Sequence, residues 1–364
     1  MNKTQPTRIE GIDFARGISI FMVILVHTLW MNGTIPVQEG WLGNIIHFIG
    51  KGTGMFLITM GVSFMVSRNN SALRSIRRGV LLLLTAYTMN FLKFVLPVLV
   101  NVMPEDFIRA YGWHSPLNSD QYIYLITTGD ILQLAGYALL IMGLMRKFFS
   151  NKYVYLIAAG VVIISPIFLR GLHTGYVVTD YFLDLLCSNN WHVYFSLCPW
   201  MSFIFVGMFF GALYVEKGRS LRAFHSMLPV GLVLFIAGIG FLLMNFDFHF
   251  GDFYHLGPGG SIYLIGFNLL LIRLAFFTVK AMPFNKLKRV VYYMSSRVTS
   301  LYFIQWVLIC WGMALFGYQK QPEMIVILLM IFYAVLTFSV QKVMDRMLLW
   351  MKRKKQIETP VIVQ

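Results

Sequence analysis

The sequence has few charged residues and very few acidic ones. Of its 364 residues, 12% are charged and 15 are Asp or Glu, whereas soluble domains carry roughly 25% charged residues. A water-soluble fold of this length cannot cover its surface with so few charges, because 58% of its residues are hydrophobic. The excess apolar surface must therefore face lipid.

Cysteine is also scarce, and the motifs of several chemistries are missing. Cys187, Cys198 and Cys310 make no disulfide framework, so we expect no structural disulfide. The sequence shows no Gly-rich phosphate loop and no nucleophile elbow. Its eight His are scattered, which predicts no metal site. A transporter of an anionic or sugar-like solute is the alternative function. Against it, the sequence lacks the paired broken helices and repeats that are typical of transporters.

Long apolar runs occur along most of the chain. A membrane-crossing helix needs about 20 mainly apolar residues, and ten runs approach or exceed that length. The sequence therefore predicts an all-α, polytopic membrane domain over residues 1–351, followed by a basic tail over 352–364. The predicted spans are 14–32, 42–66, 79–101, 128–145, 153–169, 194–215, 227–246, 261–281, 300–318 and 323–350.

Lys and Arg concentrate in alternate connections. This positive-inside pattern predicts cytoplasmic N and C termini, and it explains the net charge of +15 without a nucleic-acid partner. We expect the cytoplasmic membrane of a bacterium, with the basic tail on anionic lipid. The outside connections carry Arg109, Arg170 and Lys320. The inside segments carry 23 basic residues: Lys3, Arg8, Arg68, Arg74, Arg77, Arg78, Arg146, Lys147, Lys152, Lys217, Arg219, Arg222, Lys280, Lys286, Lys288, Arg289, Arg297, Lys342, Arg346, Lys352, Arg353, Lys354 and Lys355.

Some basic residues fall within the predicted spans, where each suggests a function. Asp13 and Asp130 lie near span ends, so no acidic residue is expected to be buried beside these bases. An anionic ligand would supply the missing negative charge, and a water-filled cavity is the alternative. The bases are Arg16, Lys51, Lys93 and Arg273.

The first span carries two polar residues on one face. Arg16 and His27 are eleven residues apart, which is close to three helical turns and roughly 16 Å along the axis. Asp13, one turn before Arg16, can orient the guanidinium. This spacing suits an anionic donor at the inner end and an acceptor that reaches His27 from outside. Interfacial packing of His27 is the alternative.

Six motifs follow one another over roughly residues 8–310. The first three are IDFARG before the apolar run to His27, MFLITMGVSF at 55–64 and RRGVLLLL at 77–84. The other three are GDILQLAG at 129–136, CPWMSFIFVGMFFG at 198–211 and TSLYFIQ at 299–305. The first three resemble motifs of the membrane acyltransferases, in the expected order, and the other three most closely resemble the heparan-α-glucosaminide N-acetyltransferase-like branch of that superfamily.

This resemblance implies transfer of an acyl group, usually acetyl, from cytoplasmic acetyl-CoA to an extracytoplasmic sugar or glycan. The wider superfamily places its functional His where this chain has His27. The heparan-like branch often has Asn there and a His near the outer end of the second span, where this chain has His47. Either His would act as a general base or carry the acyl group itself. Oligomeric state is left open.

The remaining expected site residues lie near these two histidines or at the cytoplasmic end of the predicted spans. Asp13 joins the catalytic set through Arg16. Lys51, together with Gln133 and Trp200, is a candidate donor to the thioester oxygen of the bound acetyl-CoA. CoA phosphates are expected at the cytoplasmic mouth, on Arg16, Arg77, Arg78 and Arg297.

Overall fold

A computed structural model describes residues 8–67, 71–283 and 285–358. The predicted inside charges Lys3 and Arg68 lie outside these described residues, as does the side chain of Lys355. Within the described ranges the named elements are all helices, so the predicted all-α class is confirmed.

Nine helical segments of the described chain are long and apolar enough to cross a membrane. A tenth, shorter apolar segment, Tyr153–Leu169, occupies the fifth predicted span. The sequence therefore predicted the polytopic architecture correctly. The nine comprise α1 (Glu10–Asn32), α3 (Trp41–Gly50) joined to α4 (Gly54–Val66), α5 (Ala72–Asn90) continued by α6 (Leu96–Leu99), α9 (Ile131–Phe148), α13 (Leu197–Glu216), α14 (Met227–Met244), α16 (Pro258–Ala281), α18 (Val298–Phe316) and α19 (Glu323–Glu358); the tenth is α10 (Tyr153–Ile164) with α11 (Pro166–Leu169).

Short helices lie in the three longest connections between the predicted spans. Residues 102–127 contain α7 (Glu105–Ala110) and α8 (Ser119–Thr127), residues 170–193 contain α12 (Val177–Cys187), and residues 247–260 contain α15 (Phe246–Phe250) near their start. Two further short helices are α2 (Ile35–Glu39) and α17 (Lys286–Ser296).

Backbone pairings fasten some of these connections together. Gly33 pairs with Gln321, and Gly129 pairs with Val193. The amide of Gly129 donates to the His192 carbonyl at 2.8 Å, and the Tyr194 amide donates to the Gly129 carbonyl at 2.8 Å. The segment before α13 is thereby held against the start of α9.

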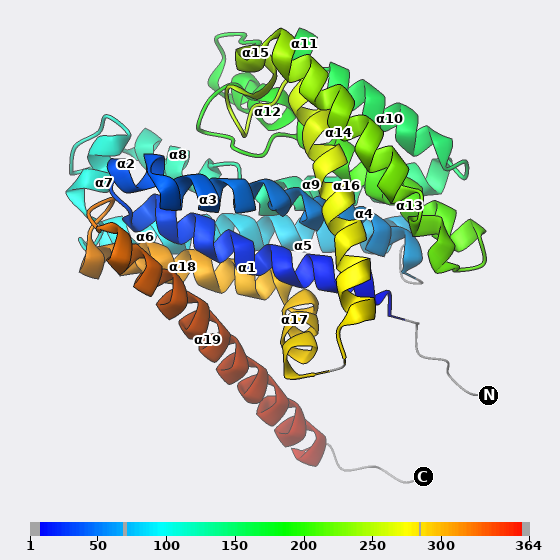
Figure 1. The fold of residues 1–364 in the computed structure, drawn as a ribbon. Coiled ribbons are helices and arrows are strands. Elements are labelled where there is room, and N and C mark those ends of the chain that lie inside the picture. The colour runs from blue at the N-terminus through cyan, green and yellow to red at the C-terminus, as the bar shows by residue number, and fades with distance from the viewer. Residues whose placement is uncertain (1–7, 68–70, 284, 359–364) are drawn as a thin grey trace.

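Helix α1 occupies the centre of one helical group and contacts α3, α4, α16, α17, α18 and α19. In Figure 1 it lies between the other blue helices and the orange α18, while the green helices form a second group above and the yellow α16 runs from that group down past α1. The two groups meet where α4 packs on α13 and where α16 packs on α1.

Two glycines explain the close approach of α4 and α13. A Cβ atom on Gly61 would lie 2.1 Å from the carbonyl oxygen of Ile204, and one on Gly207 would lie 2.0 Å from that of Ile58. Small residues at membrane-helix contacts allow backbones to approach in this way. The glycine motifs of these two spans are therefore packing features that fix the wall behind the site.

Candidate active site

A series of cavities follows α1 from one end of the bundle to the other. We call them the basic cavity, the waist, the lysine cavity and the aromatic cavity, with volumes of about 510, 20, 370 and 620 Å³. Arg16 lines the first of them, and His27 lines the last two. One helix thus carries a cation at one end of the series and an imidazole at the other.

The basic cavity is built around a fixed guanidinium. Arg16 donates from Nη2 to Asp13 at 2.8 Å, from Nε to the Ser295 hydroxyl at 2.9 Å and from Nη1 to the Ser63 hydroxyl at 3.2 Å. Asp13 therefore orients Arg16, as its spacing suggested. Asp13 lies fourteen residues from His27, roughly 21 Å along a helix, and it contacts the Arg16 guanidinium without itself lining the basic cavity.

A glycine in α1 brings Ser295 within reach of Arg16. A Cβ atom on Gly17 would lie 2.2 Å from the carbonyl oxygen of Val291, so α17 can lie against α1 only because this position has no side chain. Helix α17 consequently presents Ser295 to the guanidinium.

The basic cavity has the features of an anion site. The first residues of α18, from Val298 to Ser300, line it, and a helix N-terminus attracts negative charge. Arg78 and Arg297 line it as well, although Arg297 also pairs with Asp345 at 3.0 Å. Arg77 is exposed and is not among the residues that line this cavity.

The waist joins the basic cavity to the lysine cavity. It shares Phe56, Leu132 and Val298 with the basic cavity. It shares Val23, Thr53, Ile131 and Tyr302 with the lysine cavity. The described side chains therefore leave a narrow apolar neck between two wider spaces.

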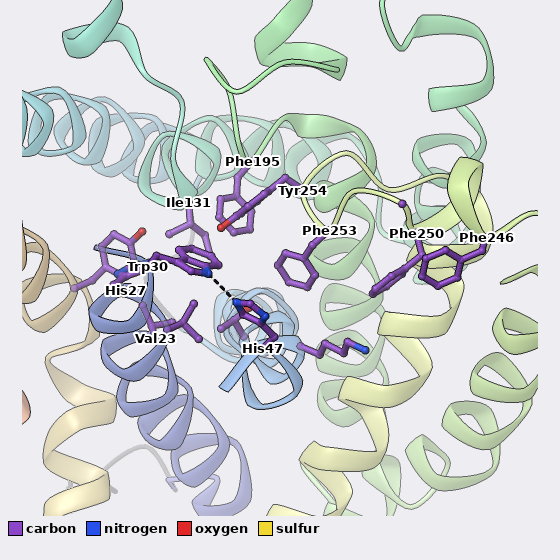
Figure 2. A pocket seen from close by; sticks show the side chains of 16 residues that line it. Val23, His27, Trp30, His47, Ile131, Phe195, Phe246, Phe250, Phe253 and Tyr254 are labelled. Atoms are coloured by element: carbon purple, nitrogen blue, oxygen red, sulfur yellow. Dashed lines mark hydrogen bonds between the residues drawn. The ribbon is translucent and has the colours of Figure 1, made fainter. Parts of the chain in front are cut away.

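The lysine and aromatic cavities meet at His27 and share Trp30, Phe195 and Tyr254. Figure 2 shows His27 and His47 on opposite sides of Trp30, with Phe253 and Phe250 extending the wall toward α15. The aromatic cavity is lined mainly by rings, namely Trp30, Phe94, Phe107, Tyr111, Trp191, Tyr194, Phe195, Tyr254, Trp306 and Tyr318.

His27 is buried and held by two neighbours from α18. Its Nδ1 lies 3.1 Å from Gln305 Oε1 and 3.0 Å from Gln305 Nε2, so the direction of this hydrogen bond depends on the tautomer, and its ring stacks on Trp306 with centroids 3.7 Å apart. The Gln305 amide also donates to the Tyr302 carbonyl at 3.0 Å. When Nδ1–H donates to Oε1, Nε2 is unprotonated, and this is the tautomer that a general base requires.

A buried ion pair lies beside His27 and corrects the expectation that the buried bases have no counter-ion. Lys93 Nζ lies 3.1 Å from Asp130 Oδ2, and 2% and 7% of the two side-chain surfaces are exposed. Lys93 sits in a π-helical turn over Phe91–Val95, and Asp130 caps α9. The other carboxylate oxygen, Oδ1, accepts from the Tyr302 hydroxyl at 2.6 Å.

His47 and Lys51 both line the lysine cavity. His47 is exposed, and its Nε2 accepts a hydrogen bond from Trp30 Nε1 at 3.1 Å. The Lys51 ammonium lies 5.2 Å from the Phe250 ring centroid and 5.9 Å from that of Tyr263. Among the described residues, no carboxylate pairs with Lys51.

Two predicted donors to the thioester oxygen hold the structure together instead of facing a cavity. Gln133 completes a capping box with Asp130, and its amide donates to the Thr128 carbonyl at 3.1 Å. Trp200 is buried and donates to the Tyr254 carbonyl at 2.8 Å. Neither residue is among those that line the four cavities.

Polar residues of the connection between α14 and α16 help to position the aromatic wall. His255 contacts Asp252 at 2.6 Å through Nδ1 and the Val193 carbonyl at 3.0 Å through Nε2. Although burial acts to raise the pKa of Asp252, hydrogen bonds from His255 and the Tyr254 amide hold that pKa below its usual value. These contacts hold Tyr254 at the junction of the lysine and aromatic cavities.

The fold and its cavities define an integral-membrane protein with a buried His at one end of a row of cavities and a cluster of cations at the other. Residues 8–241, well over half of the chain, match the family described as heparan-alpha-glucosaminide N-acetyltransferase, catalytic, and the chain belongs to that family. An acetyltransferase-type function follows from this membership. A comparison with curated proteins gave no match.

Proposed function

We propose that this protein transfers an acetyl group from cytoplasmic acetyl-CoA to an extracytoplasmic sugar or glycan. The basic cavity would face the cytoplasm and the aromatic cavity the outside, in keeping with the alternation of Lys and Arg along the chain. A bacterial cytoplasmic membrane suits this arrangement.

The succession of cavities along α1, in which neighbouring cavities share lining residues, is the observation that carries the proposal. Arg16, Arg78 and the start of α18 would hold CoA phosphates in the basic cavity. The apolar waist, with a volume of about 20 Å³, would have to widen to admit the slender pantetheine arm, which would bring the thioester to the lysine cavity. An acceptor in the aromatic cavity would meet it at His27, which both outer cavities share.

His27 is proposed as the general base or, if the reaction has two steps, as the acyl carrier. Both routes use Nε2 while Nδ1–H is held by Gln305. Lys51 lines the same cavity and would stabilise the oxyanion that develops on the thioester carbonyl. His47 would support the site through Trp30, to which it is hydrogen-bonded.

Acetyl-CoA should raise the melting temperature of the purified protein, because a ligand that binds the folded state stabilises it by mass action. Arg16→Ala should reduce this shift, since it removes the cation that Asp13, Ser63 and Ser295 fix in the basic cavity. The measurement is thermal unfolding in detergent–lipid micelles over a range of acetyl-CoA concentrations.

Arg78→Ala and Arg77→Ala make a matched pair for this experiment. Both arginines are exposed, but Arg78 lines the basic cavity and Arg77 does not. The first variant should weaken the shift and the second should preserve it. Absence of any shift in the wild-type protein at saturating acetyl-CoA would contradict the proposed function.

A further inference from the structure

The charges around the two outer cavities bear on the acceptor's chemistry. Among the residues that line these cavities, all of which are described, Asp130 is the one carboxylate. Its oxygens are already engaged by Lys93 at 3.1 Å, the Tyr302 hydroxyl at 2.6 Å and the Ile131 amide at 2.7 Å. It has no negative charge left over for a ligand.

The cations of these cavities outnumber that carboxylate. Lys93 neutralises Asp130, and Lys51 adds a second positive charge, which no carboxylate of the described chain pairs with. With His27 neutral, as a base must be, Lys93 and Asp130 balance in the aromatic cavity, and the surplus positive charge is that of Lys51 in the lysine cavity, where the acceptor group must meet the thioester. An amino sugar is protonated near neutral pH, and burying its ammonium here would place an unpaired cation beside another.

The polar groups that remain on the wall are neutral. The aromatic cavity presents the phenols of Tyr111, Tyr194 and Tyr318 together with the amides of Gln38 and Gln319. Burial raises the pKa of Tyr111 and Tyr194 well above the usual value, so both phenols stay uncharged. Phenols and amides both donate and accept hydrogen bonds, which suits hydroxyl groups, and the rings offer apolar faces to the C–H face of a sugar.

We propose that the acceptor group is a hydroxyl and that the product is an acetate ester, not the amide that the family's description names. This inference rests on the proposed function and specifies its acceptor. His27 Nε2 takes the hydroxyl proton as the oxygen forms a bond to the thioester carbonyl carbon. The C–S bond then breaks, and the CoA sulfur leaves with the proton that His27 returns.

Ester and amide products can be separated by mild alkali, which cleaves acetate esters and leaves acetamides intact. The experiment uses the native host with its gene deleted and then complemented by the wild-type sequence or by His27→Asn. Cells are fed deuterated acetate, and envelope carbohydrate is isolated. The deuterated acetyl groups whose presence depends on the gene are quantified by mass spectrometry before and after the alkali treatment.

We expect label in the wild-type complement that the deletion and the His27→Asn strains lack, and we expect alkali to remove nearly all of it. Gene-dependent label that survives alkali would show an amide product; it would overturn the hydroxyl acceptor but leave the acetyltransfer proposal standing. Wild-type and deletion strains with equal label would overturn the proposed function itself, and the inference with it.

Discussion

Replacing His27 with Asn should lower the rate of acetyl transfer by about 10²–10⁴-fold, the usual loss when a positioned general base is removed. Asn keeps a side chain of similar size that can still face Gln305, but it cannot take a proton from the acceptor. The rate is measured as transfer of radiolabelled acetyl from acetyl-CoA to membranes of the native host. Acetyl-CoA should still raise the melting temperature of this variant, because the basic cavity is untouched.

His47→Asn is the matched comparison, since His47 borders the same cavity as His27 but is exposed and hydrogen-bonded to Trp30. Its loss of rate should be much smaller. The opposite order of damage would move the chemistry to the start of the second span, next to Lys51, and the His27 assignment would fail.

Replacing Lys93 with Met should destabilise the protein by about 3–5 kcal/mol, the typical effect of breaking a buried ion pair. The substitution leaves the Asp130 carboxylate buried without its cation. Adding Asp130→Asn should restore much of the lost stability, because the Asn oxygen can still accept from Tyr302 and from the Ile131 amide. Denaturant unfolding in micelles of the wild type, both single variants and the double variant measures this coupling.

An exposed pair supplies the control for this cycle. Lys320 and Asp106 form an ion pair with 61% and 42% of their side-chain surfaces exposed, so Lys320→Met should change the stability little. Strictly additive effects of Lys93→Met and Asp130→Asn would show that these two residues do not stabilise the fold as a pair.

The spanning helices could be predicted because their signal is local. Each apolar run predicts one membrane-spanning helix, and the helix bounds in the described chain follow the predicted spans closely. The short helices α7, α8 and α12 carry too few apolar residues to stand out from a connection.

The arrangement around His27 depends on contacts between residues far apart in the sequence. Asp130 is 37 positions from Lys93, and Gln305 is 278 positions from His27. The sequence did contain one clue, because Asp130 followed three residues later by Gln133 is the pattern of a helix-capping box. That pattern predicts the start of α9, but it does not predict the lysine that reaches Asp130 from the π-helical turn.

Two of the expected site residues were predicted only from their chemistry and from the resemblance of the motifs that contain them. Gln133 and Trp200 belong to the segments GDILQLAG and CPWMSFIFVGMFFG, and in the structure both are occupied with carbonyl oxygens of neighbouring loops. In contrast, Arg16 and His27 were placed by helical periodicity as well, and the structure puts each of them on a cavity wall.

Transport of the acetyl group across the membrane is the central claim, and inverted membrane vesicles test it most directly. Vesicles from the native host expose their cytoplasmic face, so radiolabelled acetyl-CoA added outside reaches the basic cavity and cannot enter the lumen. The account predicts acetylated carbohydrate in the lumen, protected from an added esterase until detergent is present, and its loss in vesicles that carry His27→Asn. Labelled product that the esterase removes without detergent, or equal labelling with His27→Asn, would contradict it.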